Sequence, residues 1–333
     1  MKKLKNIAKN AIVKNSKIDA SEIIIHDNAK LDGVIIKAKK VTIDADSVLT
    51  DCKLFSDGEI TIGKKSEIKE QAVINSFKGI SIGDRCLIDR NVFVGGMQSE
   101  ESEIVIGNDC VILYRAYLNP TKKITIENNV GVGGYSQIFT HGAWQNVLKG
   151  YPNKFSPITI KDNAWIPWNV MILPGVIIGK NAIIGAGSVI TKNIPDNVFA
   201  AGNPAVIKSK NIKKKEPNEK EKNKIMIEIL ESFHNYAKNF LKNPNKIEKS
   251  NHGSNQHITV SFKDKSQIAY AIKWNSTPKN KKTILVSFKI SEKIKSIKKI
   301  EWIELDTLKS NVTSDAGNSF QSFLKRFGIR IKI

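Results

Sequence analysis

An aliphatic residue returns at every sixth position between Ile160 and Ile190. Helices repeat every 3.6 residues and strands every two, so neither element accounts for this period. A period of six is typical of a β-helix, in which each short strand forms one side of a triangular coil and about 18 residues close one turn. An ordinary β-sandwich is the alternative, but its turns come at irregular spacings of roughly 8–12 residues. The returning residues are Ile160, Ile166, Ile172, Ile178, Ile184 and Ile190, and the first five are followed four places later by Ala164, Val170, Val176, Ala182 and Ser188.

The six-residue repeat extends well beyond this stretch. It is ragged from Lys17 to Asp57 and regular from Ile62 onward. We therefore predict a β-helix over residues 1–207, a basic linker over 208–224 and a small α+β domain over 225–333. Glycine follows the returning aliphatic at several corners, where we expect it to supply a positive φ. These glycines are Gly63, Gly83, Gly107, Gly179 and Gly185.

The repeat is interrupted twice, near residues 96–103 and over residues 141–157. A β-helix accepts insertions only at its corners, and loops that leave a rigid scaffold commonly carry function. The longer interruption begins at His141. Only His26 and His141 of the five histidines lie in the repeat region, and His26 belongs to the ragged first coils.

Composition and charge indicate a soluble cytoplasmic protein with an uneven charge distribution. The net charge is +21, and residues 208–333 hold 28 lysines and arginines against 12 acidic residues, compared with 25 against 20 in residues 1–207. No apolar run is long enough for a secretion signal or a membrane span.

The three cysteines lack CxxC spacing. We therefore expect neither a disulfide framework nor a zinc site, and we place Cys86 and Cys110 in the core.

Residues 106–207 resemble the hexapeptide-repeat acyltransferases, the left-handed β-helix superfamily, and in particular its branch of maltose and galactoside O-acetyltransferases. This resemblance implies a left-handed coil, an acetyl-CoA co-substrate, a sugar acceptor and assembly as a homotrimer, with the active site between subunits and no metal. The resembling segments are Phe139–His141, Pro157–Ile166, Leu173–Gly179, Gly185–Val189, Lys192 and Gly202–Ala205.

The resemblance assigns the role of general base to His141. Transfer of an acyl group from a thioester to a hydroxyl needs a base near neutral pH, and imidazole suits this task. An asparagine near the position of Asn119 contacts the acceptor sugar in similar enzymes, and a corner asparagine in a left-handed turn is the alternative. Trp144, in the long interruption, is expected to stack on the sugar or to pin the loop.

The resemblance also implies a coenzyme A groove between neighbouring solenoids. Gly185 and Ala186 permit close approach to the pantetheine arm, and Trp165 forms a wall of the groove. Lys192 and Lys208 are expected to meet the phosphates, although generic surface lysine is the alternative. The chain departs from the family where Pro167 replaces a glycine, because proline has no amide donor, and bulky Trp168 follows.

Other functions remain open at this stage. The acceptor is either a sugar hydroxyl, as in a surface-glycan precursor, or the amine of an amino sugar or nucleotide-linked amino sugar. A γ-class carbonic anhydrase needs three histidines per zinc, and a sugar nucleotidyltransferase needs a nucleotide-binding domain ahead of the repeats. A non-catalytic glycan-binding scaffold is the third alternative. The basic C-terminal region is expected to contact an anionic glycan or a membrane surface, and it contains no recognisable nucleic-acid module.

Overall fold

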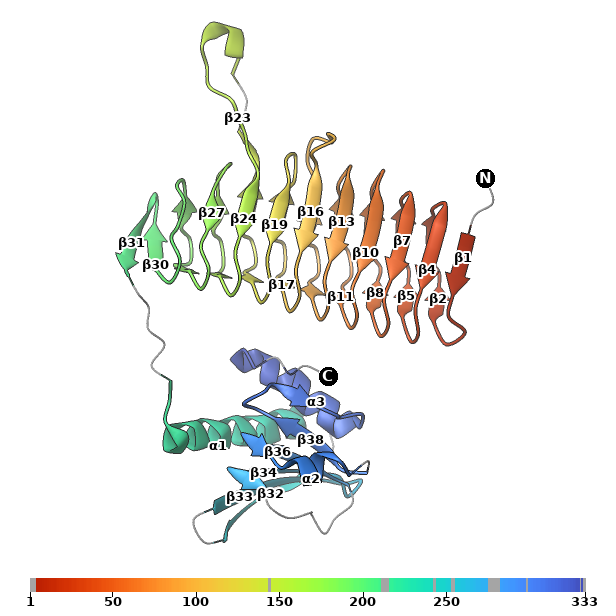
Figure 1. Ribbon diagram of the computed structural model, residues 1–333, viewed down its shortest axis with the longest axis vertical. Helices are drawn as coiled ribbons and strands as arrows, with labels where there is room; N and C mark the ends of the chain where they lie inside the picture. Colours follow the sequence, from red (N-terminus) through yellow and green to blue (C-terminus); the bar gives the residue numbers. More distant parts are fainter. Residues whose placement is uncertain are drawn as a thin grey trace. The chain divides into compact units, whose positions relative to one another are not determined.

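The computed structural model describes residues 4–142, 145–210, 216–241, 244–252, 255–274, 282–297, 299–329 and 331. The six-residue repeats wind into a three-walled parallel β-helix, in which each strand pairs with its equivalents one coil before and one coil after (Figure 1). We call the sheets wall A, wall B and wall C in chain order, and the turns that join them corners AB, BC and CA. The predicted fold class, a left-handed parallel β-helix followed by a small α+β domain, is confirmed.

Each complete coil contributes one strand to each wall. Wall A holds β1 (Leu4–Ile7), β4 (Glu22–Ile25), β7 (Lys40–Ile43), β10 (Glu59–Ile62), β13 (Gly79–Ile82), β16 (Glu103–Ile106), β19 (Ile124–Ile126), β24 (Ile158–Ile160) and β27 (Ile177–Ile178). Wall B holds β2 (Ile12–Lys14), β5 (Lys30–Asp32), β8 (Val48–Thr50), β11 (Glu67–Ile68), β14 (Leu87–Ile88), β17 (Val111–Ile112), β20 (Gly131–Val132), β25 (Trp165–Ile166), β28 (Ile183–Ile184), β30 (Phe199–Gly202) and β31 (Ala205–Ser209). Wall C holds β3 (Lys17–Asp19), β6 (Ile35–Lys37), β9 (Lys53–Phe55), β12 (Val73–Asn75), β15 (Phe93–Val94), β18 (Tyr117–Asn119), β21 (Gln137–Phe139), β26 (Met171–Ile172) and β29 (Val189–Ile190).

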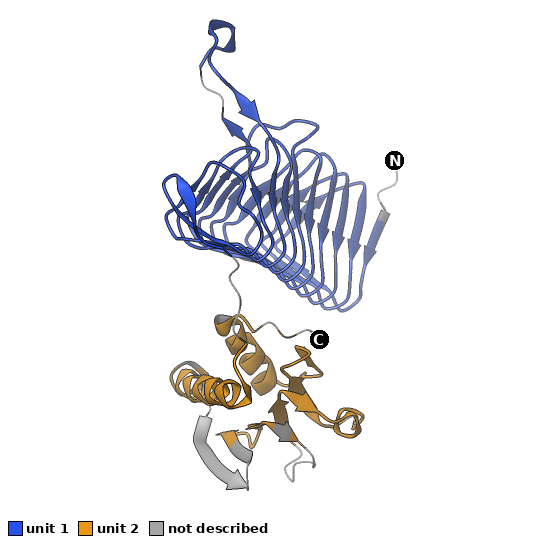
Figure 2. Ribbon diagram, turned by 60° about the vertical axis from the view of Figure 1, so that its left-hand side comes forward, with its two compact units in different colours: residues 1–214 blue, residues 215–333 orange. Residues whose placement is uncertain are grey.

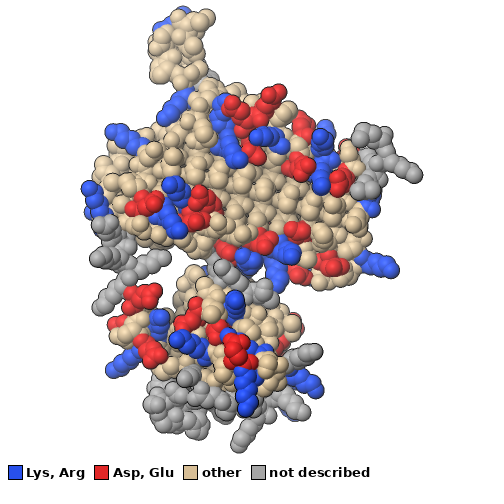
Figure 3. All heavy atoms as spheres, in the orientation of Figure 1, with Lys and Arg blue, Asp and Glu red and all other residues tan. Residues whose placement is uncertain are grey.

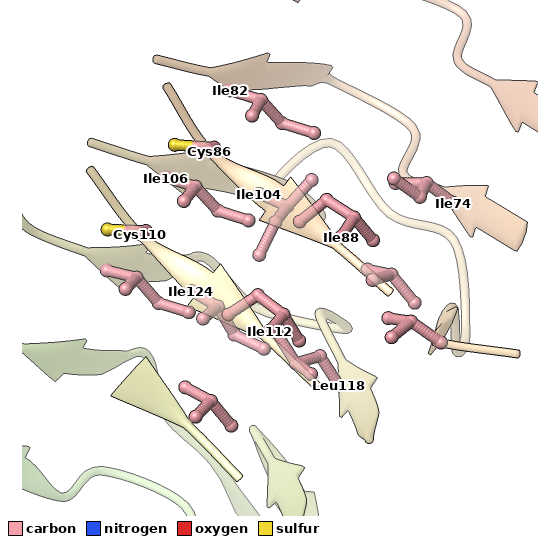
Figure 4. Packing of buried hydrophobic residues seen from close by; sticks show 14 of the residues in the cluster. Ile74, Ile82, Cys86, Ile88, Ile104, Ile106, Cys110, Ile112, Leu118 and Ile124 are labelled. Carbon is pink, nitrogen blue, oxygen red and sulfur yellow. The ribbon is translucent and has the colours of Figure 1, made fainter. Parts of the chain in front are cut away.

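The returning aliphatics point into the prism and stack in columns. Ile82 pairs in register with Ile106 on wall A, and Ile88 with Ile112 on wall B (Figure 4). Burying each such side chain stabilises the fold by roughly 1.5–3 kcal/mol. The small residues predicted near the corners, Ala164, Val170, Val176, Ala182 and Ser188, are also buried.

All three cysteines are buried in this column structure, and none of them forms a disulfide. The thiols of Cys86 and Cys110 donate to the carbonyls of Gly107 and Glu127 in the following coil, each at 2.9 Å. Burial, with a smaller contribution from the charge of Asp51, raises the pKa of Cys52 to about 12. The predicted core role of Cys86 and Cys110 is therefore confirmed.

The corner glycines serve a different purpose from the one predicted. Gly63, Gly83 and Gly107 do not have positive φ; the left-handed positions lie two residues later, at Lys65 (φ 57°) and its equivalents. A Cβ on Gly63 would lie 2.5 Å from the carbonyl carbon of Gly83 one coil on, and Gly83 is blocked in the same way by Gly107. Glycine is needed at these corners because neighbouring coils approach closely, not because of backbone conformation.

The long interruption leaves corner CA as a protruding hairpin (Figure 1). Its base is the short antiparallel pair β22 (His141–Gly142) and β23 (Lys154–Phe155), and a 3-10 turn, η1 (Val147–Lys149), lies near its tip. The tip exposes apolar side chains, with Leu148 93% and Tyr151 48% exposed.

The chain divides into two compact units, residues 1–214 and 215–333 (Figure 2). The last strand of unit 1, β31, runs antiparallel to β30. In unit 2, helix α1 (Glu219–Tyr236) begins inside the predicted 208–224 linker, so that part of the linker prediction is wrong. A capping box explains the early start, because the side chain of Asn218 accepts from the amide of Glu221 while Glu221 accepts from the amide of Asn218.

Unit 2 is a mixed six-stranded sheet packed against helices. Phe233 of α1 contacts Phe320 and Phe323 of α3 (Asp315–Leu324), and Met226, Ile229 and Leu230 of α1 are buried in the same core. None of the helices among the described residues has the length and apolar character needed to cross a membrane. The sheet order is β32 (Pro244–His252), β33 (Asn255–Phe262), β34 (Gln267–Ala271), β36 (Thr283–Ser287), β38 (Glu301–Glu304) and β39 (Lys309–Ser310); the remaining elements are β35 (Lys273–Trp274), β37 (Lys289–Ile290), α2 (Glu292–Lys295), α3 (Asp315–Leu324) and the short helices η2 (Ala237–Leu241) and η3 (Lys325–Phe327).

Candidate active site

His141 lies where wall C ends and the hairpin begins. It follows β21 and Thr140, and it pairs with Phe155 across the base of the hairpin. The imidazole stacks on the ring of Phe155, with centroids 5.8 Å apart and planes inclined by 21°. The histidine is half-buried, so its ring is held from one side while part of it stays accessible.

A chain of hydrogen bonds reaches the imidazole from the preceding coil. Nδ1 of His141 lies 3.3 Å from Oγ1 of Thr121, which lies 2.8 Å from Oδ1 of Asn119. The amide of Thr121 also donates to Oδ1 of Asn119, and Nδ2 of Asn119 donates to the hydroxyl of Tyr117 at 2.9 Å. The backbone amide of Thr121 therefore determines which way round the side-chain amide of Asn119 is held.

This row of hydrogen bonds determines which atom of each side chain donates and which accepts. Oδ1 of Asn119 only accepts, so the hydroxyl of Thr121 donates its single hydrogen there. The remaining lone pairs of Thr121 Oγ1 are then available to accept from Nδ1–H of His141. A neutral imidazole with its proton on Nδ1 carries its basic lone pair on Nε2.

The short interruption of the repeat, residues 96–103, packs against the residues that hold the imidazole in place. Gly96 lies so close to Asn119 that an added Cβ would be 2.1 Å from its Oδ1. The hydroxyl of Ser99 donates to the carbonyl of Thr121 at 3.0 Å, and Lys122 forms an ion pair with Glu101. Both interruptions of the repeat thus meet at the same place, on either side of Thr121.

Asn119 lies behind the imidazole, where its side chain supports Thr121. Only 4% of its surface is exposed, and both of its side-chain polar atoms bond within the protein. A contact between Asn119 and the acceptor stays a prediction. Thr121, Tyr117 and Phe155 were not predicted, since nothing in their spacing separates them from other residues of the repeat. Trp144 lies outside the described residues.

The predicted coenzyme residues are distributed around the prism. Trp165 is 56% exposed on the outer face of wall B, the wall opposite corner CA and His141. Gly185 and Ala186 lie at corner BC, after β28, and Lys208 lies on β31. Lys192 follows β29 at corner CA, two coils beyond His141, which is about 10 Å along the axis at the usual strand spacing. One copy of the chain therefore does not bring His141 and Trp165 together.

The proline that replaces a glycine at position 167 removes one hydrogen bond between coils. The amides at the equivalent positions, Gly133 and Gly185, donate to carbonyls of the following coil, those of Ile166 and Ala200. The donor missing from Pro167 is therefore a bond between coils, and β25 and β28 accordingly pair at only one position. Trp168 fills the corner beside Gly134 and Tyr135.

Within the described residues, no three histidine, cysteine or acidic side chains form a group suited to holding a metal ion.

The repeat, the corner hairpin and the anchored histidine define a β-helical acyltransferase, and the comparisons with known proteins agree. Residues 157–192 match the model of the bacterial transferase hexapeptide (six repeats), and residues 60–96 match the hexapeptide repeat of succinyl-transferase. An acetyltransferase of Saccharomyces cerevisiae is 35% identical over 150 residues, which is 44% of this chain and 74% of that protein. The galactoside O-acetyltransferase of Escherichia coli is 32% identical over 141 residues, 42% of this chain and 68% of that protein.

Solved structures similar to this chain include two with the coenzyme bound. A hexapeptide-repeat acetyltransferase of Vibrio cholerae in complex with acetyl coenzyme A is 26% identical, covers 36% of this chain and 66% of that chain, and gives a TM-score of 0.33. A galactoside acetyltransferase in complex with coenzyme A is 33% identical, covers 35% and 59% of the two chains, and gives a TM-score of 0.32. The chain belongs to the hexapeptide-repeat acetyltransferase family.

Proposed function

We propose that this protein transfers an acetyl group from acetyl-CoA directly to a hydroxyl of a sugar or surface-glycan precursor, with His141 as general base. The observation that carries the proposal is the anchoring of Nδ1 of His141 by Thr121, which leaves Nε2 as the basic nitrogen. A relative that resembles this chain over 68% of its own length is named as a galactoside O-acetyltransferase, which supports a sugar acceptor.

The reaction needs one proton shuttle and no covalent enzyme intermediate. Nε2 of His141 takes the proton of the acceptor hydroxyl as its oxygen attacks the thioester carbonyl. Backbone amides stabilise the resulting tetrahedral oxyanion. The intermediate collapses with cleavage of the C–S bond, and the imidazolium returns the proton to the departing thiolate. The products are the acetylated sugar and free coenzyme A.

The coenzyme is proposed to lie along corner BC, with Gly185 and Ala186 admitting the pantetheine arm and Trp165 beside it. Lys192 and Lys208 are exposed and meet the phosphates, Lys208 from the copy that supplies Trp165 and Lys192, at corner CA, from the copy that supplies His141. Because Trp165 and His141 lie on opposite sides of one prism, a site that uses both takes them from two copies. A homotrimer with cyclic symmetry forms three such sites.

The protruding hairpin supports this assembly. Its tip carries Leu148 and Tyr151, large apolar groups that are exposed in the single chain. A hairpin that reaches beyond its own prism is suited to covering the site of a neighbouring copy. Trp144 is proposed to take part in the acceptor contact from the same loop.

Two further proposals concern the role of unit 2 and the cellular location of the protein. We propose that unit 2 recruits an anionic glycan or membrane surface, although acidic and basic side chains are interspersed on the face of the molecule seen in Figure 3. A cytoplasmic location is proposed because the three buried cysteines form no disulfide.

The test is release of coenzyme A thiol from acetyl-CoA in the presence of a panel of sugars, amino sugars and nucleotide sugars. We expect turnover with a sugar hydroxyl, and a loss of roughly 10²–10⁴-fold in kcat for His141→Ala. His141→Asn keeps a polar side chain near the position of Nδ1 but has no basic nitrogen, so it should be equally impaired. A folded His141→Ala protein with more than about a tenth of wild-type turnover, or turnover with amines alone, would contradict the proposal.

A further inference from the structure

The turns at corner BC form a continuous line along the solenoid. In each coil two residues make the turn, and the amide of the second donates to the carbonyl of the first residue one coil earlier. Asn91 donates to Glu70, Arg115 to Arg90, Tyr135 to Tyr114, Asn169 to Gly134 and Gly187 to Trp168, at distances of 2.9–3.3 Å. These turn residues therefore stack in register from Glu70 to Gly187.

Three consecutive coils place an aromatic ring at this corner. Tyr114 and Tyr135 make an edge-to-face contact with centroids 5.7 Å apart, and Tyr135 and Trp168 lie 6.0 Å apart. The guanidinium of Arg115 lies 5.1 Å from the ring of Tyr114. Tyr135 is 43% and Trp168 49% exposed, so the row presents aromatic surface to solvent.

The turn geometry does not favour Tyr135, which is the one ring of the row at the second turn position; Tyr114 and Trp168 are the first residues of their turns. The second turn residue has a positive φ, 57° at Tyr135 and 56° at Arg115. Asn91, Asn169 and Gly187 occupy the same turn position in other coils, and asparagine or glycine suits it best. A bulky residue is strained there, because its Cβ lies too close to the following carbonyl oxygen. A side chain held against that strain points to a role outside folding.

A surface pocket adjoins the N-terminal end of the aromatic row. Its volume is about 500 Å³, within the range of small-molecule sites, and it is lined by Glu70, Gln71, Arg90, Asn91 and Tyr114. The lining therefore combines one aromatic ring with carboxylate, amide and guanidinium groups, which are planar hydrogen-bonding groups of both donor and acceptor kinds.

Corner BC also carries Gly185 and Ala186, where the proposed coenzyme site lies. Three coil steps separate Ala186 from Tyr114, which is about 15 Å at the usual strand spacing, and two further steps lead to Glu70. The coenzyme residues, the aromatic row and the pocket thus follow one another along a single edge of the solenoid.

We propose that corner BC from Glu70 to Trp168 is a binding groove for the acceptor in the form of an extended oligosaccharide. The exposed rings pack against the apolar faces of successive sugar units, and the pocket groups bond their hydroxyls. This inference rests on the proposed function and narrows its acceptor class from a sugar or surface-glycan precursor to an extended glycan chain. A nucleic-acid strand fits less well, because a phosphate chain needs a continuous row of cations and Glu70 sits beside Arg90.

The experiment measures oligosaccharide binding to the full-length protein by titration calorimetry, without acetyl-CoA. The probes are neutral and N-acetylated disaccharides and longer oligomers of the same sugars, with a single-stranded oligonucleotide for comparison. We expect longer oligomers to bind about tenfold more tightly than disaccharides. Tyr114→Ala and Arg90→Ala should each remove most of that gain. Lys64→Ala, an exposed side chain at corner AB near the level of Glu70, is the matched control and should leave binding unchanged.

Each other result counts against the groove. Affinity that does not depend on chain length, or that neither variant changes, overturns it, as does tighter binding of the oligonucleotide than of every glycan. A drop in particle mass of Tyr114→Ala or Arg90→Ala by light scattering shows that the corner is a contact between copies, which also overturns it. Because the titration contains no acetyl donor, oligosaccharide binding without any acetyl transfer would contradict the proposed function and leave the groove standing.

Discussion

At the scale of single residues, the proposed catalytic nitrogen, Nε2 of His141, is oriented by groups that contact the other side of the imidazole. Asn119 directs the hydroxyl of Thr121, and the hydroxyl oxygen then receives Nδ1–H of His141. Phe155 supports the ring face at the same time. Fixing one tautomer in advance removes a rearrangement that an unrestrained imidazole would undergo before each turnover.

Thr121→Val tests this arrangement. Valine keeps the shape of threonine but offers no acceptor to Nδ1, so we expect kcat to fall roughly 10–100-fold while KM for acetyl-CoA stays unchanged. Thr121→Ser restores the hydroxyl and should recover most of the activity. Nitrogen NMR shifts of the imidazole report the tautomer directly, and a Thr121→Val protein with wild-type shifts and wild-type kcat would show that the contact has no positioning role.

His141 could be singled out from sequence because it starts the longest break in the repeat. Thr121 could not, because its contact with His141 spans 20 positions and depends on the coils being stacked in register. Asn119 was noticed for a local reason, as an asparagine at a coil end, but its role depends on Tyr117 and Thr121 as neighbours. Contacts between coils follow from the three-dimensional stacking and have no counterpart in the local pattern.

At the scale of elements, the strands alternate between one inward and one outward side chain, and only the inward set carries the core. In β6, Ile36 is 1% exposed and Ile35, its neighbour, is 38% exposed. The walls were predictable from sequence because this alternation repeats in every coil. The antiparallel pairing of β31 with β30 was not, because no period extends past the last coil.

The pair in β6 gives a matched stability test. Ile36→Ala opens a cavity between stacked coils and should lower the free energy of unfolding of unit 1 by about 2–5 kcal/mol. Ile35→Ala removes the same atoms from the outer face and should cost less than about 1 kcal/mol. Equal shifts of the two variants in thermal unfolding would contradict the inward packing of the returning aliphatics.

At the scale of the whole molecule, the proposed site is divided between opposite sides of the prism, with His141 at corner CA and Trp165 on wall B. This division makes oligomer formation part of the proposed chemistry. Each copy would supply the base to one site and a coenzyme wall to another. The histidine and, through the family resemblance, a site between subunits were expected from the sequence, whereas the wall on which each residue lies is given by the structure.

Subunit mixing tests the shared site. His141→Ala and Trp165→Ala proteins should each be strongly impaired alone. Refolding or co-expressing them together should restore up to ~25% of wild-type activity, because in a random trimer about one interface in four pairs an intact histidine with an intact tryptophan. Failure of the mixed protein to exceed its two parents, with mixed trimers confirmed by mass, would place both residues in a site within one copy.

The last pair of wall B has a consequence for how these molecules behave at high concentration. A stack of parallel strands ordinarily finishes in a row of unsatisfied amides and carbonyls, which is a template on which another stack can grow into a filament. Here β31 folds back on β30 and occupies that row with antiparallel bonds from the same chain. A further parallel coil therefore cannot pair with β30, and the strand that now forms the edge of wall B, β31, runs in the opposite direction and offers no in-register template for a parallel stack.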